Sequence, residues 1–258
     1  MNIEESAYYL HLPYIRKHYE DLLKEAHLKD MSHKDFLEEL LSREAELRYS
    51  NGVNKRISTS KFPYKITFIE YKRDHLSTEV KTKIKEVETL EFIKNGENII
   101  LVGNPGTGKT ALSIALGIKA CKEGKSVLFI SVPDLLLKLR EAMSNNQITS
   151  FKRKFESYDL VILDELGYCT FDKERGEILF NLLSSRSQNK SLIITSNLTL
   201  DKWEEVFKDK ILTAAIIDRL ANKAYLIDMS GESYRIKQTR EWMDKQWWKI
   251  LNINTSGI

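Results

Sequence analysis

The sequence predicts an α/β protein: a central parallel five-stranded sheet between helices, preceded by a small all-helical N-terminal domain. Two observations carry this prediction. From residue 76 onward, five short apolar runs rich in Ile, Val, Leu or Phe alternate with longer helical patterns. Before residue 60, the pattern is helical and charged. Strands that alternate with helices form parallel sheets whose two faces are both covered.

The helical domain is expected over residues 1–60, and a connector over residues 61–75. Helical spacing predicts one helix over residues 15–28. A second helix is predicted within "SHKDFLEELLSREAELR", where Ser32 and Asp35 form an N-terminal capping pair.

The second helix has an apolar stripe made of Phe36, Leu37, Leu40, Leu41 and Ala45. The dipeptide Asn51-Gly52 is a turn signal and is expected to break this helix. Pro63 is expected to end any helix before it, because a proline disfavours helical backbone in the residue that precedes it.

The second domain, residues 76–258, is expected to contain the sheet. Its predicted strands are residues 98–103, 126–132, 158–164, 191–196 and 224–228. Its predicted helices are residues 109–122, 133–143, 173–187 and 202–222, the last one broken.

Composition excludes some classes of protein and leaves others open. The net charge of +3 and a pI near 8.6 permit nucleic-acid binding without arguing for it. Cys121 and Cys169 lack metal-ligand spacing, which argues against a zinc site or a disulfide scaffold. The N-terminal residues lack the apolar region of a signal peptide, and no stretch approaches the roughly 18 apolar residues of a membrane helix. We therefore expect a cytoplasmic protein without membrane contact.

The segment "GNPGTGKT" fits the P-loop pattern G-x-x-x-x-G-K-[ST] in full, between the apolar strand "NIILV" and an apolar-faced helix. Its glycines let backbone N–H groups surround phosphate oxygens, and the helix N-terminus adds its dipole. Lys109 is expected to reach the β- and γ-phosphates, and the Thr110 hydroxyl to bind Mg²⁺. The residues expected to hold the nucleotide are Gly103, Asn104, Pro105, Gly106, Thr107, Gly108, Lys109, Thr110 and Ala111.

The segment "YDLVILDELGY" supplies two carboxylates at the end of an apolar strand. Asp164 is expected to hold the Mg²⁺ at the sheet edge. Glu165 can polarise a water molecule for attack on the γ-phosphate, which favours hydrolysis over transfer to a second small molecule. Without the P-loop, a solvated acidic pair would explain these residues equally well.

Three further residues suit a hydrolase that senses its nucleotide. Asn197 ends the strand "SLIITSN", where its amide can orient the attacking water, although a turn or helix-cap role is the alternative. Arg219 in "AIIDRLANKA" and Arg235 in "GESYRIK" can stabilise charge on the γ-phosphate. Taken by themselves, both arginines fit a surface or structural role at least equally well.

Basic residues cluster in "KLREAMSNNQITSFKRKFESY", and the DNA-binding candidates there are Lys138, Arg140, Lys152, Arg153 and Lys154. Clustered cations bind phosphates with release of counterions, although a solvated helix face is the slightly favoured alternative from sequence alone. No helix-turn-helix or zinc-finger pattern is present, so backbone contacts are expected rather than base recognition. Near the C-terminus, Trp242, Trp247 and Trp248 suit a packing helix or, alternatively, an anchor for a partner.

These motifs, in this order, resemble those of an AAA+ ATPase of the IstB type, the helper ATPase of insertion-sequence transposition, close to the DnaC-like helicase loaders. The resemblance runs through "GNPGTGKT", "VILDELGY", "LIITSN", "AIIDRL" and "GESYRIK", and it continues into the N-terminal segment. It implies ATP and Mg²⁺ as cofactors, assembly on duplex DNA in the presence of ATP, and a cognate transposase as partner.

The resemblance also implies a role for each residue. Lys109 and Thr110 take the Walker A positions, and Asp164 and Glu165 take the Walker B positions. Asn197 falls on sensor 1 and Arg235 on sensor 2. Arg219 falls on the arginine finger, which acts in trans on the ATP of a neighbouring subunit in an ATP-dependent homo-oligomer. The first sixty residues are short of lysine and arginine, so the resemblance favours subunit and transposase contacts there over general DNA binding.

Three alternatives stay open at this point. A replicative helicase loader would share the same ATPase and differ in the protein that docks on its N-terminal domain. A GTPase or small-molecule kinase would share the P-loop, but no N-K-x-D motif is present and Glu165 suits hydrolysis. A structural role would need nucleotide binding without turnover.

Overall fold

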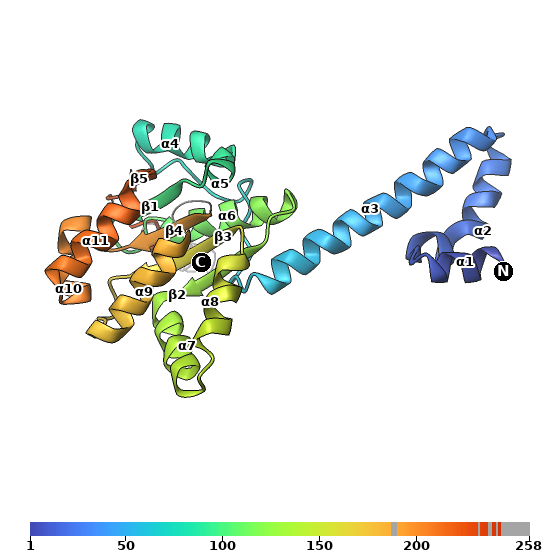
Figure 1. Cartoon of the computed structure of the whole chain (residues 1–258). Helices are drawn as coiled ribbons and strands as arrows, with labels where there is room; N and C mark the ends of the chain where they lie inside the picture. The colour runs from blue at the N-terminus through green and yellow to red at the C-terminus, as the bar shows by residue number, and fades with distance from the viewer. Residues whose placement is uncertain (187–189, 232, 237–238, 241, 244–258) are drawn as a thin grey trace, which may run out of the picture. The chain divides into compact units, whose positions relative to one another are not determined.

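The computed structural model describes residues 1–186, 190–231, 233–236, 239–240 and 242–243. The chain divides into two compact units, Met1–Arg56 and Ile57–Ile258. The first unit contains α1 (Ile3–Tyr9), α2 (Pro13–Leu28) and most of α3 (His33–Thr59). The second unit contains the sheet (Figure 1).

A buried carboxylate holds two helices of the first unit together. Glu44 of α3 is only 4% exposed. Its Oε2 atom accepts hydrogen bonds from the backbone N–H groups of Tyr14 and Ile15, at 2.9 and 3.1 Å. Both N–H groups belong to the first turn of α2, where no helical partner exists, so Glu44 acts as the cap that the sequence of α2 lacks.

The predicted capping pair of α3 is present. The Ser32 Oγ atom accepts from the backbone N–H of Asp35 at 3.2 Å and donates to its carboxylate at 2.7 Å. The predicted break at Asn51-Gly52 is wrong, because α3 continues to Thr59. One glycine inside a helix costs about 1 kcal/mol relative to alanine, which a helix of 27 residues tolerates.

The predicted apolar stripe of α3 is only partly covered. Leu37 and Leu41 are 54% and 60% exposed, and Ala45 is exposed as well. The buried side chains of α3 are instead Glu44 and Val53. A simple helical spacing rule misplaces this face because it assigns the buried positions to apolar residues only, whereas the polar Glu44 is buried by its capping role.

The α/β fold class is confirmed. The strands are β1 (Asn98–Val102), β2 (Val127–Ser131), β3 (Leu160–Leu166), β4 (Ser191–Ser196) and β5 (Ala224–Asp228). The helices of this unit are α4 (Thr78–Glu88), α5 (Glu91–Asn95), α6 (Lys109–Lys122), α7 (Val132–Ser144), α8 (Ile148–Ser157), α9 (Lys173–Arg186), α10 (Glu204–Phe207) and α11 (Lys210–Ala221), with a 3₁₀ turn, η1, at Leu200–Trp203. The strand order is β2-β3-β4-β1-β5, and all pairs are parallel.

Two apolar layers enclose the sheet (Figure 1). One layer packs α7, α8, α9 and α11 against the sheet, and the other packs α4, α5 and α6. The central strands β1, β3 and β4 are almost fully buried, as continuous apolar runs in a doubly covered sheet should be. Because these three strands are neighbours and parallel, their carboxyl ends meet at one edge, where ligands bind in such folds.

Residues 61–75, predicted as a connector, lie within the second unit. Phe62, Ile66 and Phe68 pack against the layer of α4, α5 and α6, and Tyr71 is buried. The helices α4 and α5 were not predicted from the sequence. Both are short, and their apolar residues complete the same core layer.

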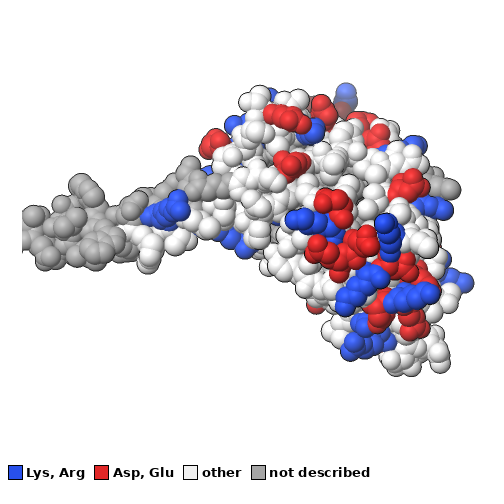
Figure 2. Space-filling model, turned by 90° about the vertical axis from the view of Figure 1, so that its left-hand side faces the viewer, with Lys and Arg blue, Asp and Glu red and all other residues white. Residues whose placement is uncertain are grey.

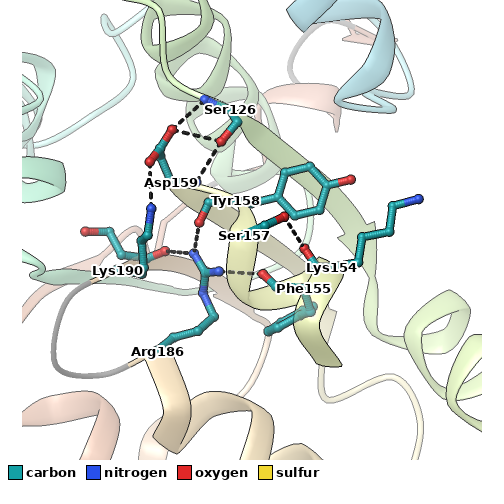
Figure 3. A network of polar contacts seen from close by, with 9 residues as sticks. Ser126, Lys154, Phe155, Ser157, Tyr158, Asp159, Arg186 and Lys190 are labelled. Atoms are coloured by element: carbon teal, nitrogen blue, oxygen red, sulfur yellow. Dashed lines mark hydrogen bonds and ion pairs between the residues drawn. The ribbon is translucent and has the colours of Figure 1, made fainter. Parts of the chain in front are cut away.

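A polar network at the amino end of β3 fixes α8 to the sheet (Figure 3). The fully buried Arg186, at the end of α9, donates to the backbone carbonyls of Phe155, Tyr158 and Ser191 at 2.6, 3.0 and 3.2 Å. Its guanidinium also lies 5.4 Å from the centre of the Phe155 ring. Burial lowers the pKa of Arg186 to about 10, so it stays charged near neutral pH. Arg186 thereby satisfies carbonyls at the end of α8.

Asp159 joins the edge strand to the same network. Its carboxylate accepts from the Lys190 amine at 2.7 Å and from the backbone and hydroxyl of Ser126 at 2.9 and 2.8 Å. Burial acts to raise the pKa of Asp159, but the hydrogen bonds from Lys190 and Ser126 outweigh it and lower the pKa to about 2. Asp159 therefore stabilises the fold while it is ionised.

Replacing Asp159 by asparagine is expected to lower the free energy of unfolding by about 1–2 kcal/mol near pH 6, a value discounted for partial solvent exposure. The folded pKa of about 2 lies below the unfolded value of roughly 3.9. The contribution of Asp159 is thus complete above the unfolded pKa and is lost as the pH falls through the folded pKa. Urea unfolding should show the gap between wild type and variant closing from about pH 4 to pH 2. The exposed Asp74, replaced by asparagine, is the control; a gap that stays constant with pH would contradict the assignment.

Candidate functional site

The P-loop connects β1 to α6 and has the backbone that its glycines allow. Gly103, Gly106 and Gly108 all have positive φ angles, of 140°, 82° and 95°. A Cβ atom on Gly103 would lie 2.6 Å from the Met229 backbone, so no larger residue fits there. Gly108 precedes the first turn of α6 and turns the free N–H groups of that helix toward the loop.

Lys109 is held inside this loop. Its amine donates to the backbone carbonyls of Gly103 and Asn104 at 2.6 and 2.7 Å, and the Thr107 hydroxyl also donates to Asn104 at 2.9 Å. Burial lowers the pKa of Lys109, while the nearby Asp164 acts to raise it. An anion in the loop would stabilise the charged amine.

A cavity of about 220 Å³ opens in front of the loop. Six P-loop residues line it, together with residues at the carboxyl ends of β3 and β4 and with Arg235. Its lining residues are Tyr64, Pro105, Gly106, Gly108, Lys109, Thr110, Ala111, Glu165, Tyr168, Thr195, Ser196, Asn197, Tyr234 and Arg235. The structure therefore brings together the P-loop, Glu165, Asn197 and Arg235 from four separate segments of the chain.

Asp164 is buried and is hydrogen-bonded to two residues that line this cavity. The Thr110 hydroxyl donates to its Oδ1 atom at 3.0 Å, and the Thr195 hydroxyl donates to the same atom at 2.6 Å. Burial raises the pKa of Asp164, and the two hydroxyls and Lys109 oppose that rise. A buried carboxylate beside a threonine hydroxyl is a set of hard oxygen ligands that fits Mg²⁺. Thr195 was not identified from the sequence, because its place beside Asp164 follows from the pairing of β3 with β4.

Glu165 leaves the strand direction at the sheet edge. Its φ angle is 67°, in the left-handed region, and its backbone N–H donates to the Thr195 hydroxyl at 3.0 Å. Left-handed backbone in a residue other than glycine is costly and is concentrated at functional sites. The Glu165 side chain is exposed, so it can meet a water molecule in the cavity.

Asn197 presents an unsatisfied polar atom at the same place. Its Oδ1 atom is buried and has no hydrogen-bond partner among the described residues. A Cβ atom on Gly167 would collide with this oxygen, so the glycine two residues after Glu165 makes room for it. A buried polar atom without a partner is expected to acquire one from a ligand or water.

The segment that carries Arg235 lies against the P-loop. The backbone N–H of Tyr234 donates to Gly106 at 3.0 Å, and the Asn104 amide donates to Gly231 at 3.3 Å. The Tyr234 ring lies against His75, with 4.9 Å between the ring centroids and a tilt of 31° between the ring planes. His75 and Tyr234 were not identified from the sequence, which has no periodic signal for a contact between residues so far apart.

Arg219 lies elsewhere, on α11. It is exposed, its guanidinium lies 5.9 Å from the centre of the Phe180 ring, and it is not among the residues that line the P-loop cavity. On the side of the unit that carries α9, α10 and α11, acidic and basic side chains are intermingled (Figure 2). Such a surface has no single sign of charge.

The basic candidates lie on α7 and α8. Arg140, Lys152, Arg153 and Lys154 are exposed, whereas Lys138 is half-buried. Lys152 forms only a long ion pair, at 3.9 Å, with Glu156. The structure thus presents the cluster at the surface of α7 and α8, and the Arg186 network ties α8 to the sheet. Trp242 is 60% exposed, and Trp247 and Trp248 lie outside the described residues.

Comparison of the sequence with known proteins finds a family of ATP-binding proteins, in agreement with the P-loop geometry. The family of IstB-like ATP binding proteins matches residues 6–242 of the chain. The chain belongs to this family. It is 33% identical to an ATP-binding protein assigned to insertion sequence IS21 of Pseudomonas aeruginosa, covering 96% of this chain and 92% of that protein. It is 32% identical to the corresponding protein of insertion sequence IS5376 from Geobacillus stearothermophilus, covering 95% and 97%.

Solved structures place this IstB-like chain among AAA+ P-loop proteins by fold. The crystal structure of DnaI aligns with a TM-score of 0.55 at 22% identity, covering 63% of this chain and 89% of that chain. DnaA from Aquifex aeolicus, bound to AMPPCP, aligns with a TM-score of 0.56 at 24% identity, covering 72% and 56%. The AAA+ fold implied by the sequence motifs is therefore confirmed. None of the helices in the described part of the chain has the length and apolar character needed to span a bilayer.

Proposed function

We propose that the protein is a Mg²⁺-dependent ATPase that assembles on duplex DNA when ATP is bound, and that it directs a transposase during insertion-sequence transposition. The observation that carries the enzymatic part is the shared Asp164: Thr110 from the P-loop helix and Thr195 from β4 both donate to one carboxylate oxygen. This arrangement places a carboxylate and a hydroxyl side by side at the mouth of a P-loop, as cation-dependent phosphoryl chemistry requires.

The P-loop residues Gly103–Ala111 are proposed to hold the triphosphate of ATP. Lys109 would exchange its bonds to the loop carbonyls for phosphate oxygens, and Thr110 and Asp164 would hold the Mg²⁺. When bound, the cation offsets negative charge on the phosphates. The ring pair of His75 and Tyr234 lies beside the loop and can contact the base.

Glu165 and Asn197 are proposed to prepare the water molecule. The exposed Glu165 carboxylate accepts a proton from it, and the unpaired amide oxygen of Asn197 orients it. Arg235, which lines the same cavity, is proposed to contact the phosphates within its own subunit. Arg219, exposed on α11 away from this cavity, is proposed to complete the site of a neighbouring subunit.

Assembly on DNA is proposed to use α7 and α8. Their exposed cations suit phosphate groups, and the mixed charges over α9–α11 suit a protein neighbour better than a polyanion. The transposase is proposed as partner because the relatives of this chain are ATP-binding proteins of insertion sequences. The first unit, with Leu37 and Leu41 exposed on α3, is the proposed contact region.

The function is tested by measuring ATP turnover and particle size with and without duplex DNA. We expect large particles only when an ATP analogue and DNA are both present, seen by negative-stain imaging beside an ATP-free control, and turnover that rises on DNA. DNA-independent phosphorylation of a metabolite would overturn the ATPase proposal. Exclusive capture of a replicative helicase, in a pull-down that also offers the transposase, would replace the transposition role by helicase loading.

A further inference from the structure

A second cavity, outside the nucleotide site, lies between α7, α8 and the edge strand β2. Its volume is about 440 Å³, within the range of small-ligand sites. Its floor is apolar, formed by Leu128 and Ile130 of β2 with aromatic rings of α8. Its charged lining residues are Lys61, Lys138, Glu141 and Lys154. Three cations against one acid indicate an anionic ligand.

Two of these lysines come from separate segments and are held close together. The segment before α4 is fixed to the free edge of β2, where the backbone N–H of Phe129 donates to Ser60 at 2.8 Å. The next residue, Lys61, has a left-handed φ angle of 64°, and Phe62 packs on Phe129. This backbone brings the Lys61 side chain close to Lys138 of α7, and both side chains line the same cavity.

No acid forms an ion pair with either of these lysines within the described part of the chain. Neither lysine has a carboxylate oxygen within 4.0 Å there. Asp134, one turn before Lys138, accepts from the Ser131 hydroxyl at 2.7 Å, and Glu141 is exposed. Burial, and then the charge of Lys61, lower the pKa of Lys138, whereas Asp134 and Glu141 act to raise it. Two ammonium groups held close together without a paired carboxylate repel each other, and an anion that binds both relieves this repulsion.

The same pair also faces the catalytic edge of the sheet. Lys61 and Lys138 line another cavity, of about 360 Å³, whose wall includes Thr110, Asp164 and Glu165. The lysine pair thus lies where the groove between α7 and α8 meets the residues proposed to hold Mg²⁺ and activate water. An anion held by this pair would contact both regions.

We propose that Lys61 and Lys138 form one phosphate-binding site, and that a single phosphodiester group of bound DNA occupies it. This inference rests on the proposed DNA-dependent ATPase function and deepens it, because it adds Lys61, which lies outside the basic segment of α7 and α8. The bound phosphate neutralises the lysine pair and fixes the DNA backbone next to the catalytic edge. DNA therefore stimulates ATP turnover through these two residues.

Salt dependence of DNA affinity tests this directly. The variants are Lys61→Gln, Lys138→Gln and the double variant, with Lys223→Gln as control, because Lys223 is an exposed lysine at the opposite edge of the sheet. One phosphate contact contributes roughly 0.9 to the slope of log affinity against log salt. We expect the slope of the double variant to be smaller by about 0.9. Each single variant should lose nearly the same amount, because one lysine alone does not hold the phosphate.

Three results would overturn the inference while leaving the proposed function intact: an unchanged slope in the double variant, a loss equal to that of Lys223→Gln, or single losses that add to about two contacts. The last result would mean two independent phosphates. Wild-type protein that fails to bind DNA with an ATP analogue present would overturn the proposed function as well, so the two failures are distinguishable.

Chemical acetylation separates DNA from free phosphate as the source of the anion. Both lysines are mapped by mass spectrometry with a short duplex or with inorganic phosphate at the same concentration of phosphate groups. We expect the duplex, near its Kd, to protect Lys61 and Lys138 together and to leave Lys223 reactive. Protection by inorganic phosphate alone, or of only one lysine of the pair, would contradict the proposal.

Discussion

Replacing Glu165 by glutamine lowers ATP turnover by about 10²–10⁴-fold, the range expected when a general base is removed, while ATP binding is kept. The amide has nearly the shape of the carboxylate but cannot accept the proton of the attacking water. The side chain is exposed, and the hydrogen bond to Thr195 comes from the backbone N–H of Glu165, which glutamine keeps, so the fold should be unchanged. We expect the variant to remain assembled on DNA with ATP, because release follows hydrolysis in the proposed cycle.

The measurement combines single-turnover hydrolysis with imaging of the DNA-bound particles over time. Glu174→Gln is the matched control, since Glu174 is also exposed and lies in the first turn of α9, outside the cavity. Particles that disassemble as quickly as those of the wild type, despite lost turnover, would separate release from hydrolysis. Unchanged turnover would remove Glu165 from the catalytic role.

Replacing Arg219 by alanine lowers turnover of the assembled protein by about 10³–10⁵-fold, the effect of losing an arginine that acts on the γ-phosphate. Nucleotide affinity of the single subunit should stay within about twofold, because Arg219 does not line the P-loop cavity of its own chain. Lys210→Ala, at the exposed start of the same helix, controls for a general effect on α11.

A mixing experiment decides whether Arg219 acts in trans. Arg219→Ala and Lys109→Ala are each inactive alone, but an interface between them can join an intact P-loop to an intact arginine. Random assembly from equal amounts makes about a quarter of the interfaces of this kind, so turnover should return to a similar fraction of wild type. No recovery in co-assembled mixtures would show that the arginine serves its own subunit.

Local signals in the sequence were sufficient for the five strands, for the helices between them that carry the P-loop and its neighbours, and for the core of the nucleotide site. The P-loop is a contiguous segment whose glycines dictate its backbone, so its residues could be named without knowing the fold. The buried strands are short apolar runs between helices, and all five are present in the sheet. Asp164, Glu165 and Asn197 follow two of these runs, and parallel strands carry such residues to a common edge.

Other signals were too weak or too distant. Asn51-Gly52 is a turn signal by local preference, yet the helix around it continues, because a cost of about 1 kcal/mol is small beside the packing of its neighbours. The connector and the five-residue α5 are too irregular or too short to show a helical period, and the core that they cover orders them. The helix α4 does have apolar residues at helical spacing, Val80, Ile84 and Val87, although it was not predicted from them. The buried Glu44 is explained only by the cap it provides to another helix.

The sequence by itself determined the fold class, the P-loop and the acids and amide that follow the strands, because each depends on residues close together in the chain. Tertiary structure alone decided which strands are neighbours, and therefore that Thr195 shares Asp164 with Thr110. It also decided that Arg219 does not line the cavity of its own chain and that Lys61 and Lys138 line the same cavity. The physical reason is that strand pairing and side-chain contacts join segments tens of residues apart, and hydrophobic periodicity carries no information about such partners.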